Sequence, residues 1–163
     1  MLKAKKGKRV GYSGVAGEQF AIVASRYNGR YTEAMVRAAK AELKRARVNK
    51  IRIVRVPGAY EIPLAAERLA RTGREAQLGA IICLGVILRG ETAHADLIGD
   101  AVTRALMEIQ LDYELPVIHE VLLLANEGQA RVRCLGRKHN RGAEAAQTAL
   151  AMAEVMRELD HKS

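Results

Sequence analysis

The architecture of this chain can be inferred from one stretch, Ala80-Ile81-Ile82-Cys83-Leu84-Gly85-Val86-Ile87-Leu88. The run lacks the polar alternation of a strand with one solvated face, so it predicts a strand that is buried on both faces. It is also far shorter than the roughly 20 residues that a membrane-spanning helix needs. Because such a strand requires cover on both sides of its sheet, an α/β fold is favoured.

Strand and helix patterns alternate on either side of this run. Further strands are predicted at Phe20–Ser25, Ile51–Val56 and Pro116–Leu124. Helices are predicted from an N-cap at Thr32 to Val48–Asn49, at Ile62–Arg71, from Thr92 or Ala93 to Leu111, at Glu127–Cys134 and at Gly142–Leu159. The third of these helices is expected to carry Leu97, Ala101, Leu106 and Ile109 on one side. This order implies right-handed crossovers and a parallel sheet with helices on both faces.

Length and composition predict one globular domain over residues 1–163, with a basic segment at 1–17. The 27 Lys and Arg residues exceed the 18 Asp and Glu residues, so the formal charge is +9. That charge suggests nucleic-acid binding, but one Phe, five Tyr and no Trp provide few rings on which bases could stack. We therefore expect no nucleic-acid partner. The basic run Lys3–Arg9 is interpreted as a solvated tail, with contact to an anionic partner or a neighbouring subunit as the alternative.

The two cysteines, Cys83 and Cys134, have neither a disulfide framework nor metal-ligand spacing. Both lie in apolar surroundings, which is typical of buried thiols in a reducing compartment. The basic start is not followed by the apolar core of a signal peptide. A cytoplasmic protein without membrane association or a metal site is expected, with a trimmed organelle-targeting segment as the alternative.

Ligands of parallel α/β sheets bind outside the carboxyl ends of the strands. That rule selects the segments Ser25–Asn28, Pro57–Glu61, Ile87–His94 and the residues after Leu124. Between a buried strand and a helix, Arg89–His94 has the features of a phosphate-binding turn, since Gly90 permits close approach and a helix N-terminus follows.

His94 would lie on the first helical turn, where an imidazole can accept and donate protons near neutral pH. The alternative is a surface or capping histidine. The basic loop Arg133–Gly142 is either solvated or a clamp on phosphate, and Glu144 is a candidate to orient one of its arginines.

Two tyrosines and one carboxylate complete the candidates at the strand ends. Tyr27 and Tyr60 could stack on a flat ring, the alternative being ordinary surface aromatics. Glu61 could accept hydrogen bonds from sugar hydroxyls.

Several of these segments together resemble one enzyme family. Val56–Ala66 and Leu84–His94 are similar to the two signatures of the 6,7-dimethyl-8-ribityllumazine synthases, and Ser25–Asn28, Pro116–Ile118 and Asn140–Ala146 match in order and spacing. The resemblance implies a flavodoxin-like three-layer α/β/α sandwich. It also implies a transferase of riboflavin biosynthesis, which condenses 5-amino-6-(D-ribitylamino)uracil with 3,4-dihydroxy-2-butanone 4-phosphate, without metal or redox cofactor.

The resemblance also implies roles for individual residues around the pyrimidine substrate. Tyr27 takes the place of the aromatic ring that stacks on the pyrimidine. The ribityl chain is expected along Ala59, Tyr60 and Glu61. The backbone that runs along the pyrimidine corresponds to Val86, Ile87 and Leu88.

On the phosphate side, Glu91 and Thr92 match the phosphate-binding turn, and His94 matches the proton-transfer histidine. Arg133 matches the arginine on the phosphate of the four-carbon substrate. Three positions depart from the family pattern. Arg141 stands where a lysine near the pyrimidine is usual, His119 stands where an aromatic side chain of the adjacent subunit is usual, and Ala95 replaces an aromatic.

Family members assemble as pentamers with active sites between neighbouring subunits. The loop Gly136–Gly142 carries no insertion relative to the shell-forming pattern, which favours twelve pentamers in an icosahedral 60-mer over a free pentamer or decamer. The N-terminal segment is expected to pair with a neighbour's sheet edge, and riboflavin synthase is a candidate partner. A non-catalytic flavin- or lumazine-binding protein, or an inactive shell protein of the same fold, remains the alternative function.

Overall fold

The computed structural model describes residues 12, 15 and 17–161 of the chain. Within them, four strands form one parallel sheet in the order β2-β1-β3-β4. The strands are β1 (Gln19–Ser25), β2 (Lys50–Val56), β3 (Leu78–Leu88) and β4 (Val117–Leu124). This order is that of the flavodoxin-like doubly wound sheets, so the predicted fold class is confirmed.

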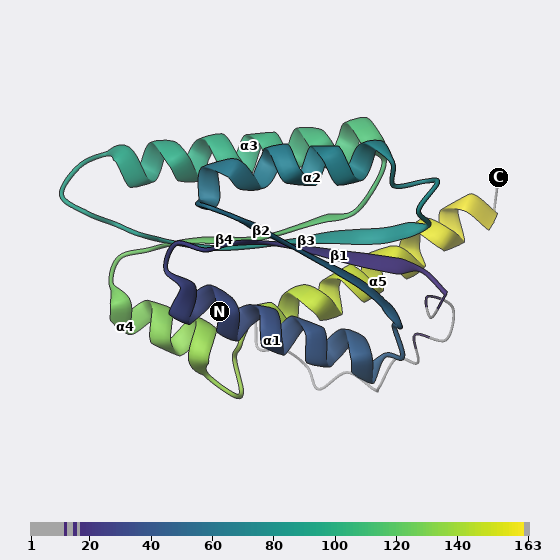
Figure 1. Cartoon of the computed structure of the whole chain (residues 1–163), viewed down its shortest axis with the longest axis horizontal. Helices are drawn as coiled ribbons and strands as arrows, with labels where there is room; N and C mark the ends of the chain where they lie inside the picture. The colour runs from purple at the N-terminus through teal and green to yellow at the C-terminus, as the bar shows by residue number, and fades with distance from the viewer. Residues whose placement is uncertain (1–11, 13–14, 16, 162–163) are drawn as a thin grey trace.

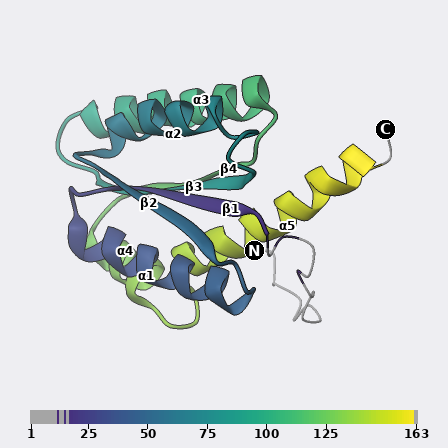
Figure 2. The same ribbon diagram turned by 45° about the vertical axis from the view of Figure 1, so that its right-hand side comes forward.

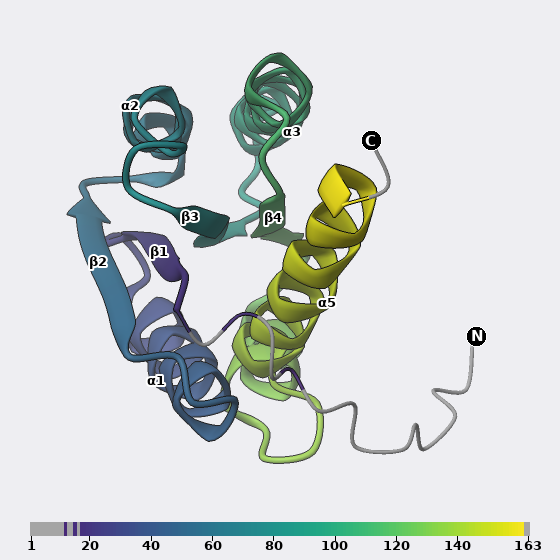
Figure 3. The same cartoon turned by 90° about the vertical axis from the view of Figure 1, so that its right-hand side faces the viewer.

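Helices cover both faces of the sheet, which makes three layers. One face carries α2 (Ile62–Arg71) and α3 (His94–Tyr113), and the other carries α1 (Gly29–Arg45) and α5 (Arg141–His161) (Figure 1, Figure 3). Three short pieces complete the chain: the 3₁₀ helix η1 (Ala59–Glu61), α4 (Glu127–Ala130) and the π-helical η2 (Arg131–Leu135). The last turns of α5 extend beyond the sheet (Figure 2).

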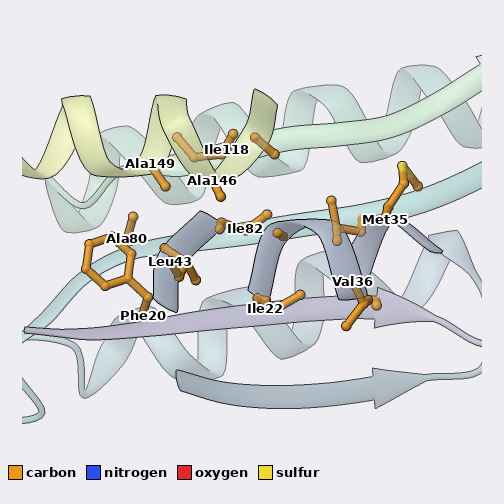
Figure 4. Packing of buried hydrophobic residues seen from close by; sticks show 14 of the residues in the cluster. Phe20, Ile22, Met35, Val36, Leu43, Ala80, Ile82, Ile118, Ala146 and Ala149 are labelled. Carbon is orange, nitrogen blue, oxygen red and sulfur yellow. The ribbon is translucent and has the colours of Figure 1, made fainter. Parts of the chain in front are cut away.

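The sheet separates two hydrophobic cores, because successive strand residues point to opposite faces. In β1, Phe20 and Ile22 pack toward α1 and α5, whereas Ala21 and Val23 pack toward α2 and α3. Figure 4 shows Phe20 and Ile22 near Leu43 in the first of these cores. Every residue from 79 to 87 in β3 is buried, as expected from its unbroken apolar run.

Close contact between α1 and α5 depends on Gly142. A Cβ atom built on Gly142 would overlap the backbone carbonyl of Met35 in α1. Small residues continue this packing along α5, where Ala145, Ala146 and Ala149 are buried. The start of α5 is therefore held against α1 without space for a side chain.

Three details of the sequence-based prediction were wrong. The helix α1 begins at Gly29, not after Thr32, because Asn28 takes the left-handed conformation (φ 55°) and starts the helix one turn earlier, leaving Thr32 buried inside it. The same helix ends at Arg45, three to four residues before the predicted end. In α3, Leu97 and Ala101 are exposed, since the buried face consists of Ala95, Val102, Leu106 and Ile109.

Candidate functional site

The turns after β1 and β2 and the end of β3 are joined by hydrogen bonds at the carboxyl edge of the sheet. The backbone N–H of Tyr27 donates to the carbonyl of Pro57 at 3.0 Å, which connects the first two turns. The side chain of Asn28 reaches β3, where its Nδ2 donates to the carbonyl of Val86 at 2.7 Å. Helix η1 packs against β1, β3 and α3. Three of the sequence-predicted segments therefore meet here.

This group is named the strand-end cluster, and its predicted residues are Tyr27, Ala59, Tyr60, Glu61, Val86, Ile87 and Leu88. The rings of Tyr27 and Tyr60 are 73% and 64% exposed, so both are free of core packing and open to a flat ligand. The Oε2 of Glu61 accepts a 2.9 Å hydrogen bond from the backbone N–H of Gly58, which holds this exposed carboxylate in place.

The end of β3 contributes backbone groups to the cluster. The side chains of Val86 and Ile87 are buried and that of Leu88 is partly buried, so the side chains serve the core. A ligand lying along this strand end would meet main-chain N–H and C=O groups. That is consistent with the backbone role that the sequence predicts for these three residues.

The turn between β3 and α3 is exposed from Arg89 to His94. The guanidinium Nη2 of Arg89 lies 2.5 Å from Oδ1 of Asp96 in the first turn of α3, so this ion pair spans the turn. A Cβ added to Gly90 would meet no atom within 4 Å, which leaves open space above the turn. Since α3 begins at His94, the partial positive charge of the helix N-terminus faces this space.

Glu91, Thr92 and His94 all lie on this turn, as predicted, with their side chains exposed to solvent. The hydroxyl of Thr92 accepts a 3.4 Å hydrogen bond from the backbone N–H of His94. An exposed turn with an imidazole at a helix N-terminus can bind an anion and exchange protons with it.

A second group of charged residues lies between β4 and the start of α5. The Nη1 of Arg141 donates to Oε2 of Glu144 at 2.7 Å, which confirms that Glu144 orients an arginine of the basic loop. On its other side, the Nε of Arg141 lies 3.3 Å from Oε2 of Glu120 in β4. We call Glu120, Arg133, Arg141 and Glu144 the charged cluster.

Burial controls the protonation of groups in and beside the charged cluster. Desolvation raises the pKa of Glu120, and the charge of Glu144 raises it further, whereas the Arg141 and Arg133 guanidinium groups lower it. Burial also raises the pKa of the neighbouring Cys134 thiol to about 11, with the Glu120 charge adding to the effect. Cys83 is fully buried, and desolvation raises its pKa too. Both cysteines are unpaired and buried, as predicted, and neither is a reactive thiolate.

His119 lies on the α3 side of β4, where its own chain engages both ring nitrogens. The backbone N–H of Val121 donates to Nδ1 at 3.1 Å, so the proton of the neutral ring is on Nε2. Nε2 is 2.8 Å from the hydroxyl of Thr103 in α3, and that hydroxyl donates to the carbonyl of Gly99 at 2.7 Å. Burial lowers the pKa of His119, in keeping with a neutral ring.

The elements that carry His94 and Arg133 lie on opposite faces of the sheet. His94 begins α3 on one face of the sheet, whereas Arg133 is in η2, which packs against α1 and α5 on the other face (Figure 1, Figure 3). Within a single chain the structure thus brings Tyr27, Tyr60 and Val86 together at the strand ends. It places Arg133 and Arg141 with Glu120 instead.

Among the described residues, one hollow borders the strand-end cluster and another lies away from both clusters. A groove of about 440 Å³ runs between α2 and α3, with Tyr60, Leu64, Ala101 and Ala105 on its walls and Glu67, Glu108 and Asp112 among its rim residues. A hollow of about 710 Å³ lies at the amino edge of the sheet, bordered by Glu18, Arg74 and Arg157. Among the described residues, no three or more His, Cys, Asp or Glu side chains are placed to hold a metal ion. No helix in that part of the chain is both long and apolar enough to span a membrane.

Sequence reasoning missed two residues of these clusters. Asn28 was included in the segment Ser25–Asn28 but was given no role of its own, although an Asn directly after a strand is a residue type that tolerates the left-handed conformation. Glu120 was assigned no role. Its signal is a carboxylate next to His119 in a strand whose other residues are all apolar, where burial requires a charged partner.

Comparison with known proteins adds an independent observation. The model of the 6,7-dimethyl-8-ribityllumazine synthase family matches residues 17–157. The chain is 39% identical over 148 residues to the 6,7-dimethyl-8-ribityllumazine synthase of Salinibacter ruber (strain DSM 13855 / M31), covering 90% of this chain and 93% of that protein. It is 40% identical over 140 residues to the protein of the same name from Xanthomonas euvesicatoria pv. vesicatoria (strain 85-10), covering 85% and 89%. The matched residues 17–157 include both clusters.

Proposed function

The chain belongs to the 6,7-dimethyl-8-ribityllumazine synthase family, and from that premise we propose how its two clusters share the reaction. The enzyme condenses 5-amino-6-(D-ribitylamino)uracil with 3,4-dihydroxy-2-butanone 4-phosphate and releases the lumazine, phosphate and water. This is a step of riboflavin biosynthesis. We assign the whole chain, residues 1–163, to one synthase domain.

The strand-end cluster binds the pyrimidine substrate in this proposal. Tyr27 stacks on the ring, and the backbone at Val86, Ile87 and Leu88 runs along its edge. Ala59, Tyr60 and Glu61 hold the ribityl chain. The exposed tyrosine rings and the Glu61 carboxylate held by Gly58 support this assignment.

The β3–α3 turn and Arg133 bind the phosphorylated substrate. Glu91 and Thr92 contribute the turn, and the N-terminus of α3 adds partial positive charge. The guanidinium of Arg133 binds the phosphate from the other side, because its planar donors match phosphate oxygens. The open space above Gly90 supports the position of the anion.

His94 transfers protons during imine formation and phosphate departure. Holding both substrates together supplies much of the rate, and a positioned acid–base group typically adds roughly 10²–10⁴-fold. The exposed position of His94 at the first turn of α3, directly after the proposed phosphate turn, supports this role.

We propose that each active site is completed by two neighbouring subunits. The observation that carries this is that α3, which begins at His94, and η2, which contains Arg133, lie on opposite faces of the sheet (Figure 3). The exposed groove between α2 and α3 supports it, because apolar Leu64 and Ala101 are open to a partner beside the site residue Tyr60. A partner on this groove would lie next to the strand-end cluster.

The assembly proposed is a pentamer, with twelve pentamers in an icosahedral 60-mer and riboflavin synthase as a candidate partner. The predicted pairing of the basic N-terminal segment with a neighbour's sheet concerns residues that lie mostly outside those the structure describes. The cytoplasm is the proposed location, supported by two buried, unpaired cysteines.

The experiment that tests the function is a two-substrate assay. Purified protein is mixed with the uracil and butanone phosphate substrates, while lumazine fluorescence and released phosphate are followed together. Equimolar formation of both products is expected. A protein that binds the lumazine but forms none from the two substrates would overturn the proposal in favour of a non-catalytic binding protein.

A further inference from the structure

Glu120 is a buried carboxylate for which the proposed reaction has no role. Its side chain is only 14% exposed, and it projects from β4 into the layer of α1 and α5. A carboxylate in such a place is costly unless a charged partner compensates it. The partner here is Arg141, the first residue of α5, whose Nε lies 3.3 Å from Oε2 of Glu120.

Arg141 is held by two carboxylates from two different elements. Glu144 accepts from its Nη1 at 2.7 Å within α5, and Glu120 approaches its Nε from β4. The contact with Glu144 orients the guanidinium only relative to its own helix. The contact with Glu120 fixes it relative to β4 and the sheet.

The hydrogen bonding of this ion pair is incomplete. Both Oε2 of Glu120 and Nε of Arg141 are buried and lack a hydrogen bond of acceptable geometry in the described chain. Neither contact uses the Nη2 end of the guanidinium. The N–H groups at this end could donate to the carbonyl oxygens of a planar ring. Guanidinium geometry favours such contacts, because its N–H groups lie in one plane and can donate in pairs.

We propose that Glu120 is a positioning residue, which aims the guanidinium of Arg141 at the pyrimidine substrate. This inference rests on the proposed function, together with the family resemblance, which puts Arg141 at the position of a lysine near the pyrimidine. Glu120 does not touch substrate. It sets the angle at which Arg141 presents its remaining donors, and it compensates the arginine's charge in the absence of substrate.

The test is a double-substitution cycle in the full-length enzyme with Glu120→Gln and Arg141→Lys. Glu120→Gln preserves the shape of the side chain and removes its charge. We expect KM for the uracil substrate to rise about tenfold, while kcat and KM for the butanone phosphate change by less than about threefold. In the Arg141→Lys background, the same change at Glu120 should alter KM by less than about twofold, because the planar guanidinium that Glu120 orients is absent.

Glu18→Gln is the matched control. Glu18 is also mostly buried, its pKa is also raised by burial, and it lies 3.7 Å from Arg157, but at the opposite edge of the sheet. Its substitution should affect stability without changing KM for the uracil substrate. An unchanged KM in Glu120→Gln, or the same rise in both Arg141 backgrounds, would overturn the positioning role.

Glu120→Asp keeps the test decisive if Glu120→Gln does not fold. The shorter side chain retains the charge, so KM for the uracil substrate should lie between those of the wild type and Arg141→Lys; a wild-type KM would refute the role. Failure of the proposed function is distinguishable, since the wild-type enzyme itself would then form no lumazine.

Discussion

The Nδ2 of Asn28 donates a 2.7 Å hydrogen bond to the carbonyl oxygen of Val86, which joins the turn after β1 to the end of β3. The chain passes from β1 to β2 on one side of the sheet and later to β3 on the other, so this bond crosses the point where the strand order reverses. Doubly wound sheets bind their ligands at this point. One side chain therefore fixes the geometry of the strand-end cluster.

Substitution of Asn28 should separate two contributions to stability, the hydrogen bond to Val86 and the left-handed backbone conformation of residue 28. Asn28→Ala loses the hydrogen bond and places an Ala at φ 55°, so the free energy of unfolding should fall by about 2 kcal/mol. Asn28→Gly tolerates that backbone and should lose about 1 kcal/mol. Urea unfolding of both variants measures the difference. Equal losses would show that the left-handed conformation contributes nothing.

Gly142→Ala should destabilise the enzyme by about 1–3 kcal/mol, because the new methyl group overlaps the backbone of Met35 and pushes α5 away from α1. Gly29→Ala is the control, since a Cβ there meets nothing within 4 Å. Thermal unfolding compares the two. If Gly142→Ala is as stable as Gly29→Ala, the close approach of the two helices is not required.

His119 should make stability depend on pH below neutrality. Burial lowers its folded pKa, so the unfolded chain takes up a proton near pH 6.5 before the folded protein does, and the free energy of unfolding falls as the pH drops from 6.5 toward the folded pKa. Burial raises the pKa of Glu18 and Glu120, which acts in the opposite direction at lower pH.

The His119 contribution is isolated by comparison with His119→Gln. Urea unfolding of both proteins at pH 8, 6 and 5 (chosen to bracket the pKa near about 6.5) should show a difference in stability that shrinks as the pH falls. A difference that stays constant across this range would contradict a neutral, partly buried His119.

His94→Ala and Arg133→Ala should impair different kinetic parameters. His94→Ala should lower kcat by about 10²-fold and leave residual turnover, because proximity of the substrates is retained. Arg133→Ala should mainly raise KM for the butanone phosphate. Steady-state kinetics with each substrate varied decide this. An unchanged KM in Arg133→Ala would contradict the phosphate assignment.

The same two variants test whether the site is shared between subunits. If the two variants are co-assembled, some sites receive His94 from one chain and Arg133 from its neighbour. The mixture should then be more active than either variant alone. Activity equal to the average of the two would place both residues in a site within one chain.

The groove between α2 and α3 should be required for assembly. Leu64 is 75% exposed there, so Leu64→Asp should place a charge in the proposed interface, lower the particle mass in light scattering and reduce activity. Lys40→Asp, on the exposed side of α1, is the control and should leave the mass unchanged. An unchanged mass in Leu64→Asp would exclude this groove from the interface.

Local sequence patterns were sufficient for most of the secondary structure. The apolar run in β3, the alternation in β2 and the stop signals around α2 predicted those elements within a few residues, because each pattern acts through near neighbours in the chain. The predicted cap at Thr32 was one exception. Its capping preference was outweighed by Asn28, whose conformation is stabilised by a partner 58 residues away.

Motifs in the chain also predicted which segments would lie at the strand ends, since the carboxyl ends of parallel strands share one edge. The role of Glu120 and the division of His94 and Arg133 between two layers followed from contacts distant in sequence. Alternation within β4 sends His119 to one face and Glu120 to the other, and only packing reveals that they meet Thr103 and Arg141. Short-range preferences choose helices and strands, whereas the partner of a buried charge depends on which layers the folded sheet brings into contact.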